Sequence, residues 1–233
     1  MCYSNSSTST NIDLSKRYKK NIDNVPEQTI YYASGFTFPT WRVITNKDNV
    51  ELMNWGLIPN WYKGNDTSEI ARNTLNARTE SIHEKASFKS LINSRRCIIP
   101  STGFFEWKHE NNSKIPYFIY PKNDIVFSMA GLFDQWKNPH TKNVITTFSI
   151  LTCTANAFMS EIHNVKKRMP LILHLNSENH WLKGEGVIQD YLNNLNFEMD
   201  AHQVNSKVIQ GKNPNIMESQ MKFEPKNIQQ TLF

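Results

Sequence analysis

The chain has 233 residues, of which 39% are hydrophobic and 12% aromatic, and this composition allows a sizeable core in one large domain or two small ones. No stretch approaches the roughly 18 uninterrupted apolar residues of a membrane span, and segment 2–11 is rich in Ser, Thr and Asn, without the apolar part of a secretory signal. We therefore expect a cytoplasmic protein without a membrane partner. Three scattered cysteines, Cys2, Cys97 and Cys153, suit neither a disulfide framework nor a zinc cage. The last two lie in apolar patterns typical of a buried core.

The net charge of +5 and the pI near 9.0 are modest. The positive residues nevertheless cluster at 16–20, 95–96 and 166–168, and such clusters suit a polyanionic partner. Charge alone favours a solvated surface of mixed sign. Aromatic and basic residues lie close together at 55–63, a composition found both in single-stranded nucleic acid grooves and in ordinary cores.

Hydrophobic periodicity and turn residues predict helices and strands in chain order. In the first part we expect a helix at 12–20, a hairpin of strands at 41–45 and 50–57, a helix that starts at Ser81 with a capping box to Glu84, and a second apolar-periodic run at 88–92. After these we expect strands at 96–100, 104–108, 117–120, 125–133 and 145–152, a helical turn at 156–162, surface helices at 177–183 and 187–195, and a last strand at 202–209.

The order of these elements predicts the fold class. Strands gather in the middle and helices at the ends, so we expect an α+β protein with a largely antiparallel sheet. No repeat or low-complexity linker interrupts the chain before about residue 210, which indicates one domain at 1–210. Residues 211–233 are polar, and we expect a partly flexible C-terminal tail.

The second residue carries the most informative chemistry. Removal of Met1 would leave a thiol and a free α-amine together on Cys2. An α-amine titrates near pH 8 and a lysine amine near 10.4, so around neutrality the terminal amine is roughly a few hundredfold richer in its reactive neutral form. The amine can form an imine with an aldehyde, and the thiolate can close a five-membered thiazolidine ring on the same carbon. On position alone, the simpler interpretation is a small residue after an initiator methionine.

Four segments become informative when they are taken together. They are Met1-Cys2, Leu75-Asn76-Ala77-Arg78-Thr79-Glu80-Ser81, the run from Arg96 to Lys108, and Ile162-His163 with Arg168-Met169-Pro170 behind it. This ordered set resembles the SRAP family, the SOS response-associated peptidase domain, whose members include abasic-site shield proteins. The resemblance covers nearly the whole chain. It implies a single domain with a barrel-like β core and short flanking helices.

The resemblance also implies a function. A member of this family crosslinks itself to abasic sites in single-stranded DNA through an N-terminal cysteine, as part of the DNA damage response. Such a protein needs no metal or cofactor, nothing demands more than a monomer, and in a bacterium it would be associated with the nucleoid. The family's nucleophile falls on Cys2, its asparagine on Asn76, its glutamate on Glu106 and its histidine on His163.

Each of these side chains has a chemical role to match. His163 titrates near neutrality and can protonate the sugar oxygen as the ring opens to its aldehyde. Glu106 can relay protons during imine formation, and strand alternation places it on one face with Phe104 and Lys108. Asn76 can hold the amine or the sugar, because an amide donates and accepts at once. Taken singly, each has an ordinary explanation: a solvent-facing histidine, a polar strand face and a loop asparagine.

Four further residues are candidates for DNA contact. The guanidinium groups of Arg78 and Arg168 match phosphate oxygens, although a surface or salt-bridged arginine is an equal alternative for Arg78. Trp61 and Tyr62 can stack on an exposed base, although most such aromatic residues belong to the core.

The chain departs from the common family pattern in two places. Many members begin Met-Cys-Gly-Arg, whereas Tyr3 and Ser4 follow Cys2 here, which puts one phosphate contact in doubt and could restrict the approach to the sugar. The spacer 164–167 between His163 and Arg168 is longer than usual and could enlarge a basic loop. Two other functions stay open: an N-terminal-nucleophile cysteine peptidase that releases Met1, and a non-catalytic single-strand binding module in which Cys2 is incidental.

Overall fold

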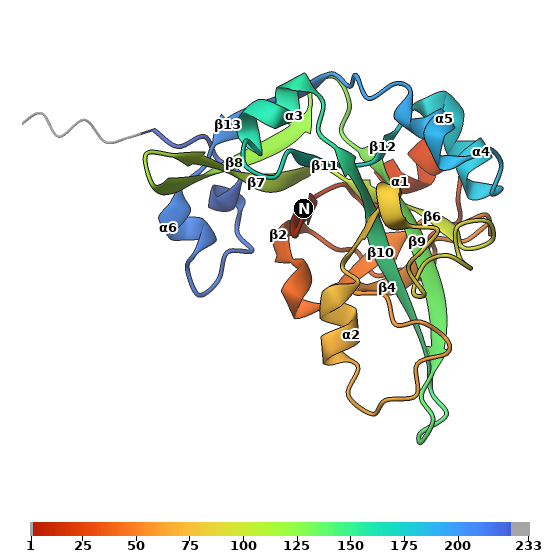
Figure 1. The fold of residues 1–233 in the computed structure, drawn as a ribbon. Helices are drawn as coiled ribbons and strands as arrows, with labels where there is room; N and C mark the ends of the chain where they lie inside the picture. Colours follow the sequence, from red (N-terminus) through yellow and green to blue (C-terminus); the bar gives the residue numbers. More distant parts are fainter. Residues whose placement is uncertain (1, 225–233) are drawn as a thin grey trace, which may run out of the picture.

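The computed structural model describes residues 2–224 and shows an α+β arrangement of two mostly antiparallel sheets with short helices at their margins (Figure 1). The predicted fold class is therefore confirmed. No helix within the described residues is long and apolar enough to cross a membrane.

The smaller sheet contains the N-terminal strand. Its strands, in spatial order, are β13 (Met199–Gln203), β8 (Ser113–Pro121), β7 (Gly103–Glu110), β1 (Ser4–Ser7) and β2 (Ile30–Ser34). All neighbours are antiparallel, and Ser4 pairs with Phe105 of β7 on one side and with Ser34 of β2 on the other. The chain start is therefore held between two strands (Figure 1).

The larger sheet is organised around one long strand. Its members are β3 (Thr40–Val43), β4 (Glu51–Trp55), β5 (Asn76–Arg78), β6 (Arg96–Ser101), β9 (Phe127–Lys137), β10 (Val144–Thr154), β11 (Arg168–Pro170) and β12 (Ile172–Leu173). Strand β10 pairs antiparallel with β9 and β11 and parallel with β4 and β5. It thus brings β5 and β11 to the same region of the sheet.

The helices are short. They are α1 (Asn11–Tyr18), α2 (Ser68–Asn73), α3 (Ala157–Ile162), α4 (Glu178–Leu182), α5 (Ile188–Leu192) and α6 (Ser206–Ile209), with 3-10 turns η1 (Gly35–Thr37), η2 (Thr79–Ser81), η3 (Leu175–Ser177) and η4 (Met217–Ser219). Thr10 and Asp13 form a capping box at the start of α1, and the Asn156 side chain caps α3. These polar side chains satisfy backbone N–H groups that the first turn of a helix leaves free.

Strand β7 separates two apolar clusters. Phe104 belongs to the main core with Cys2, whereas the next residue, Phe105, packs with Phe118 and Val204 on the other side. This alternation is the one expected for a strand with both faces covered. Cys97 and Cys153 are buried, as predicted.

Most predicted strands and helices are present within a few residues of their expected bounds, including the hairpin of β3 and β4, the strands from β6 to β10, and helices α1, α4 and α5. Two predictions were wrong. The expected helix from Ser81 through the run at 88–92 is a series of turns, joined by short-range bonds such as Phe88 N–H to Lys85 O (2.9 Å), although its apolar side chains are buried. The last strand ends at Gln203, because the Asn205 side chain caps α6.

The sheets do not close into the barrel-like core that the resemblance implies. Both are open, and an isolated antiparallel bridge from Ile44 to Ile98 connects the end of β3 with β6. One bridge supplies too few backbone pairs to continue a sheet, because closure requires a tilted and staggered register around the whole circumference.

The expected C-terminal tail has a packed first part. The Asn215 side chain accepts hydrogen bonds from the amides of Tyr31 and Tyr32 on β2, and the Gln220 amide donates to Tyr31 O (2.8 Å). Residues 225–233 of the expected tail lie outside the described part of the chain.

Candidate active site

Cys2 lies two residues before β1 and is fully buried. The Gly35 amide donates to the carbonyl of Tyr3 (2.8 Å), and the Cys2 sulfur is 3.8 Å from the carbonyl oxygen of Ser4. Burial raises the pKa of the Cys2 thiol well above its usual range, and the nearby negative charge of Glu106 raises it further. The thiol is therefore protonated at neutral pH, and the thiolate forms only when its surroundings change.

Strand β1 holds this position with polar side chains that are nevertheless buried. The Asn5 amide donates to Ser101 Oγ (2.9 Å), Ser4 Oγ lies 2.9 Å from the Tyr32 hydroxyl, and Ser6 Oγ lies 3.0 Å from Thr102 Oγ1. Tyr32 belongs to β2, Ser101 ends β6, and Thr102 lies between β6 and β7. They satisfy groups that would otherwise destabilise a buried strand.

Glu106 extends from β7 on the same face as Phe104, as predicted, and is only 4% exposed. Continuing the register of β1 with β7 places Tyr3 level with Glu106. Burial raises the pKa of the Glu106 carboxyl to about 7. Both forms of the group are therefore present near neutrality, a condition that favours proton transfer.

His163 terminates α3 and lies beside Glu106. Its Nδ1 is 2.9 Å from the carbonyl oxygen of Arg168 and 3.7 Å from Glu106 Oε2. Because a carbonyl only accepts, Nδ1 carries the proton and Nε2 is left as the acceptor of the neutral ring. Burial lowers the pKa of His163. At neutral pH the ring is therefore mostly neutral.

Asn76 begins β5 and is 8% exposed. Neither of its buried amide atoms has a hydrogen-bond partner among the described residues, which is unusual because buried polar atoms are nearly always paired. Asn76 follows Leu75, and the Leu75 side chain packs closely on Gly35: a Cβ added to Gly35 would lie 3.2 Å from it. The Gly35 amide in turn donates to the carbonyl of Tyr3. The unsatisfied amide is thus available to a bound group next to the N-terminal segment.

Glu106 and His163 border a cleft of about 350 Å³, whereas Cys2 and Asn76 are not among the residues that line it. It is lined by Tyr3, Glu106, Trp107, His109, Lys114, His163, Val165 and Lys166. Larger cavities, of about 510 and 920 Å³, lie against η2 and α6. The smaller cleft is the one that contains both the buried carboxyl and the imidazole. Among the described residues, no group of three or more His, Cys, Asp or Glu side chains is arranged to hold a metal ion.

The four candidate DNA contacts fall in different surroundings. Arg78 is exposed, and its charge acts on the Tyr3 hydroxyl at the cleft. Arg168 is buried, pairs with Glu80, and donates to the carbonyl of Thr152 (2.6 Å). Its guanidinium therefore joins β11 to β10 and η2, and so supports the backbone carbonyl that holds His163.

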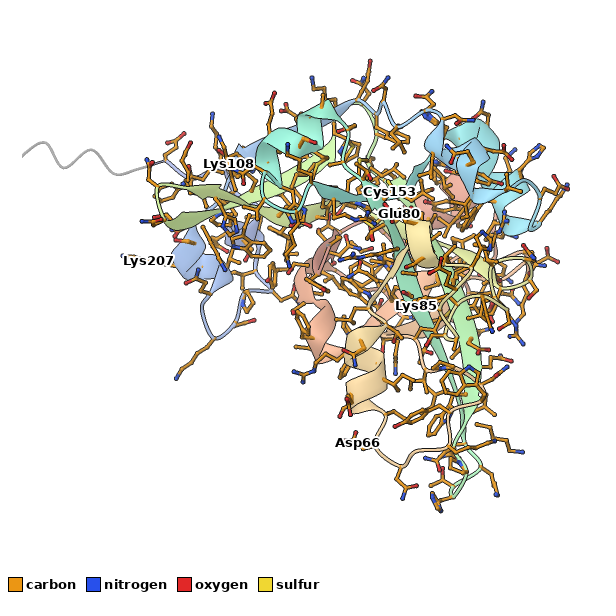
Figure 2. All side chains as sticks on the ribbon, viewed as in Figure 1. Asp66, Glu80, Lys85, Lys108, Cys153 and Lys207 are labelled. Atoms are coloured by element: carbon orange, nitrogen blue, oxygen red, sulfur yellow. The ribbon has the colours of Figure 1, made fainter. Side chains whose placement is uncertain are left out.

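Trp61 and Tyr62 lie apart from the cleft. The Tyr62 hydroxyl donates to the carbonyl of Asp66, which Figure 2 shows at the lower end of the molecule, well away from Glu80 and Cys153. The Tyr62 carbonyl accepts from the Trp136 indole (2.8 Å), so Tyr62 is partly core. Trp61 is 48% exposed.

Sequence reasoning missed three residues near the cleft. His109 and Lys114 face each other across the β7–β8 hairpin, and Phe36 packs against Tyr3 with ring centroids 4.9 Å apart. The sequence could have indicated His109 and Lys114, because a hairpin turn at Asn111-Asn112 would pair these two residues across the strands. Nothing in the sequence indicated the contact to Phe36.

Comparisons with known proteins find relatives of this chain in both sequence and fold. A sequence model of the family described as SOS response associated peptidase (SRAP) matches residues 1–211. The abasic site processing protein YoqW of Bacillus subtilis is 35% identical over 212 residues, covering 85% of this chain and 92% of that protein. HMCES of Xenopus tropicalis, also called an abasic site processing protein, is 35% identical over 139 residues, covering 52% of this chain and 41% of that protein. A crystal structure of a Bacteroides thetaiotaomicron protein superposes with a TM-score of 0.88 at 37% identity, covering 96% of this chain and all of that one.

Proposed function

Because the chain belongs to the SOS response associated peptidase (SRAP) family, we propose that it processes abasic sites in single-stranded DNA by covalent capture on Cys2 after Met1 is removed. The observation that carries the proposal is the buried strand β1, which fixes Cys2 in the same core as Phe104 and beside Glu106 and His163. The names of YoqW and HMCES support the substrate.

The chemistry releases one water. The open form of the abasic sugar presents an aldehyde at C1′, and the neutral α-amine of Cys2 adds to it to give a carbinolamine. Loss of hydroxide, protonated by Glu106, gives the imine. The Cys2 sulfur then adds to the imine carbon, its proton passes to the nitrogen, and a thiazolidine ring results. Because burial raises the pKa of the thiol, the amine attacks first and the sulfur second.

The proton that opens the sugar ring comes from the pair of Glu106 and His163. Burial moves the pKa of Glu106 up to about 7 and that of His163 down, so the carboxyl is the better proton donor at neutrality and Nε2 of the imidazole is an acceptor. Asn76 holds the carbinolamine or the sugar hydroxyl with its two unpaired amide atoms. Arg78 contacts a phosphate, and Arg168 keeps His163 in place.

Two narrower activities are part of the proposal. The peptidase in the family's name corresponds to release of Met1, which exposes the amine that the capture needs, and reversal of the crosslink would use the same Glu106 and His163. A single chain suffices for the proposed reaction, since every group named here belongs to it.

The test is a denaturing gel. Single-stranded oligonucleotide with one abasic site is incubated with the wild type, Cys2→Ala, and the control Cys97→Ala, which also removes a buried thiol. The wild type and the control should give a shifted band, and Cys2→Ala should give none. A pure binding module would give no band that survives denaturation. Intact mass of the crosslinked wild type should lack Met1, and retained methionine would end the proposal.

A further inference from the structure

An aromatic pair stands beside the reactive residue. The Tyr3 ring packs on Phe36 with centroids 4.9 Å apart and planes tilted by 40°. Tyr3 lines the cleft with Glu106 and His163, while Phe36 is 45% exposed. Of the large hydrophobic side chains exposed on the described part of the chain, only Phe36 and Trp61 are aromatic.

The backbone beneath the pair is rigid. Gly35 donates from its amide to the Tyr3 carbonyl, and a Cβ on Gly35 would lie 3.1 Å from the Trp55 ring, so the turn is pressed against the core. Thr37 Oγ1 donates to the carbonyl of Ser34 (2.8 Å). The two rings are therefore preorganised, and a ligand would lose little conformational entropy in binding to them.

Charge around the pair fits a nucleic acid strand. Tyr3 and Glu106 line the same cleft, and the exposed guanidinium of Arg78 is near enough to act electrostatically on the Tyr3 hydroxyl. Lys114 and Lys166 line the same cleft. Cations that could neutralise phosphates beside an aromatic surface are the combination that single-stranded grooves use.

We propose that Tyr3 and Phe36 form a stacking platform for the base of one nucleotide next to the abasic sugar. This inference rests on the proposed function, because it takes the abasic sugar to lie at Cys2. A base beside an abasic position has lost one stacking neighbour, so it moves onto a protein ring at less cost than a base inside a continuous stack. The platform would make capture depend on which base adjoins the lesion, because purines offer more surface than pyrimidines.

The experiment measures non-covalent binding by fluorescence anisotropy. The oligonucleotides carry a tetrahydrofuran abasic analogue, which has no aldehyde and cannot be captured, with both neighbouring bases present or with the 5′ or the 3′ neighbour also removed. The wild type should bind roughly 5- to 100-fold more weakly when one particular neighbour is absent. Phe36→Ala should bind the complete oligonucleotide more weakly than the wild type does, by a similar factor. Removal of that neighbouring base should then lower the affinity of Phe36→Ala only slightly further.

Controls separate stacking from a structural effect. Trp61→Ala removes an aromatic side chain of similar exposure and should keep the full dependence on the neighbouring base. Tyr3→Phe keeps the ring and should keep the dependence on the neighbouring base, whatever loss of the hydroxyl does to overall affinity. The proposal is overturned if Phe36→Ala binds the complete oligonucleotide as tightly as the wild type does. It is also overturned if the loss of affinity from Phe36→Ala multiplies with the loss from removing the neighbouring base. A third contrary result would be that Trp61→Ala, and not Phe36→Ala, abolishes the effect of the neighbouring base on affinity.

The result is independent of covalent capture. If the platform is absent but the denaturing gel shows a crosslink, the proposed function stands and this inference falls. If the base dependence is found but no crosslink forms with a true abasic site, the platform stands and the capture chemistry falls.

Discussion

Burial reverses the usual order of the two titrating groups in the cleft. A free histidine holds its proton at a higher pH than a free glutamate does, but here the pKa of Glu106 is raised to about 7 and that of His163 is lowered. The imidazole Nδ1 lies 3.7 Å from Glu106 Oε2, which is beyond hydrogen-bond distance, so the two groups are neighbours that interact electrostatically. From the sequence we expected His163 to act as the acid, because an unperturbed imidazole titrates near neutrality. The two pKa shifts favour the carboxyl as the proton donor in the proposed reaction.

This arrangement predicts a dependence of stability on pH. The folded-state pKa of Glu106 lies above its unfolded value of about 4.3, so the native state binds the extra proton and stability falls as pH rises between about 4.3 and 7. In Glu106→Gln the side chain is neutral at every pH, so the variant does not lose this stability as pH rises. The free energy of unfolding of the variant minus that of the wild type should therefore grow across this range, by an amount on the order of 2–4 kcal/mol.

Urea unfolding at several pH values measures the difference. The lowered pKa of His163 acts in the opposite direction, since its stabilising contribution is lost as pH falls below about 6.5, but it is present in both proteins and largely cancels. His163→Gln supplies the matching control for that group. A difference that does not change with pH would show that Glu106 is not buried as a neutral acid.

At the scale of elements, the N-terminal strand depends on one buried cation. Arg42 on β3 is 1% exposed and donates to Ser7 Oγ (3.1 Å), Ser9 O (2.8 Å) and Gln28 O (3.0 Å). Ser7 ends β1 and Ser9 follows it, while Gln28 precedes the neighbouring strand β2. Burial lowers the pKa of Arg42, but a guanidinium still keeps its proton, so the contacts persist over the whole working pH range.

Arg42→Lys should therefore loosen β1 while the rest of the fold remains. A lysine cannot reach these acceptors together, and each lost charged hydrogen bond costs about 1.5–3 kcal/mol. We expect Cys2 to react with a thiol reagent at least about tenfold faster than in the wild type, since 1.4 kcal/mol of easier opening is a factor of ten. Labelling followed by peptide mass spectrometry measures the rate at each cysteine.

The matched control is Arg96→Lys. Arg96 is equally buried and donates to Ile92, Glu185 and Gly186, but it is far along the chain from β1. It should destabilise the protein without a selective increase at Cys2. Equal acceleration in both variants would mean that global unfolding, and not β1, exposes the thiol.

The sequence predicted the strands from β6 to β10 well, because they alternate apolar residues between clear turn signals. It could not predict β1, whose side chains are polar and become buried only because hydrogen-bond partners such as Ser101 and Thr102 arrive from about a hundred residues away. The resemblance named Glu106 and His163 as candidate residues, and the structure places them in one cleft. The partners of the candidate residues were not foreseen, and Arg168 illustrates this: residue type suggested a phosphate, whereas the fold supplies Glu80.

At the scale of the whole molecule, the small net charge hides an uneven distribution. Several cations are neutralised by internal partners, as in the pairs Arg17 with Glu178 and Lys47 with Glu51. Lys166, by contrast, lines the cleft, in a loop fixed by reciprocal hydrogen bonds between Asn164 and His109. Cations of this second kind determine where a polyanion binds, because only charge that is not already paired can release counterions from a phosphate.

Salt dependence tests this distribution. For single strands, the logarithm of the binding constant falls with the logarithm of salt concentration by about 0.7 for each neutralised phosphate. Lys166→Gln should reduce the magnitude of this slope by about 0.7, the value for one phosphate, and should weaken binding most at low salt. Lys47→Gln removes an exposed cation that is already paired with Glu51, so it should leave the slope unchanged. Anisotropy titrations between about 50 and 200 mM salt cover the useful range. If both variants change the slope equally, binding follows net charge, and the cleft has no special part in holding the strand.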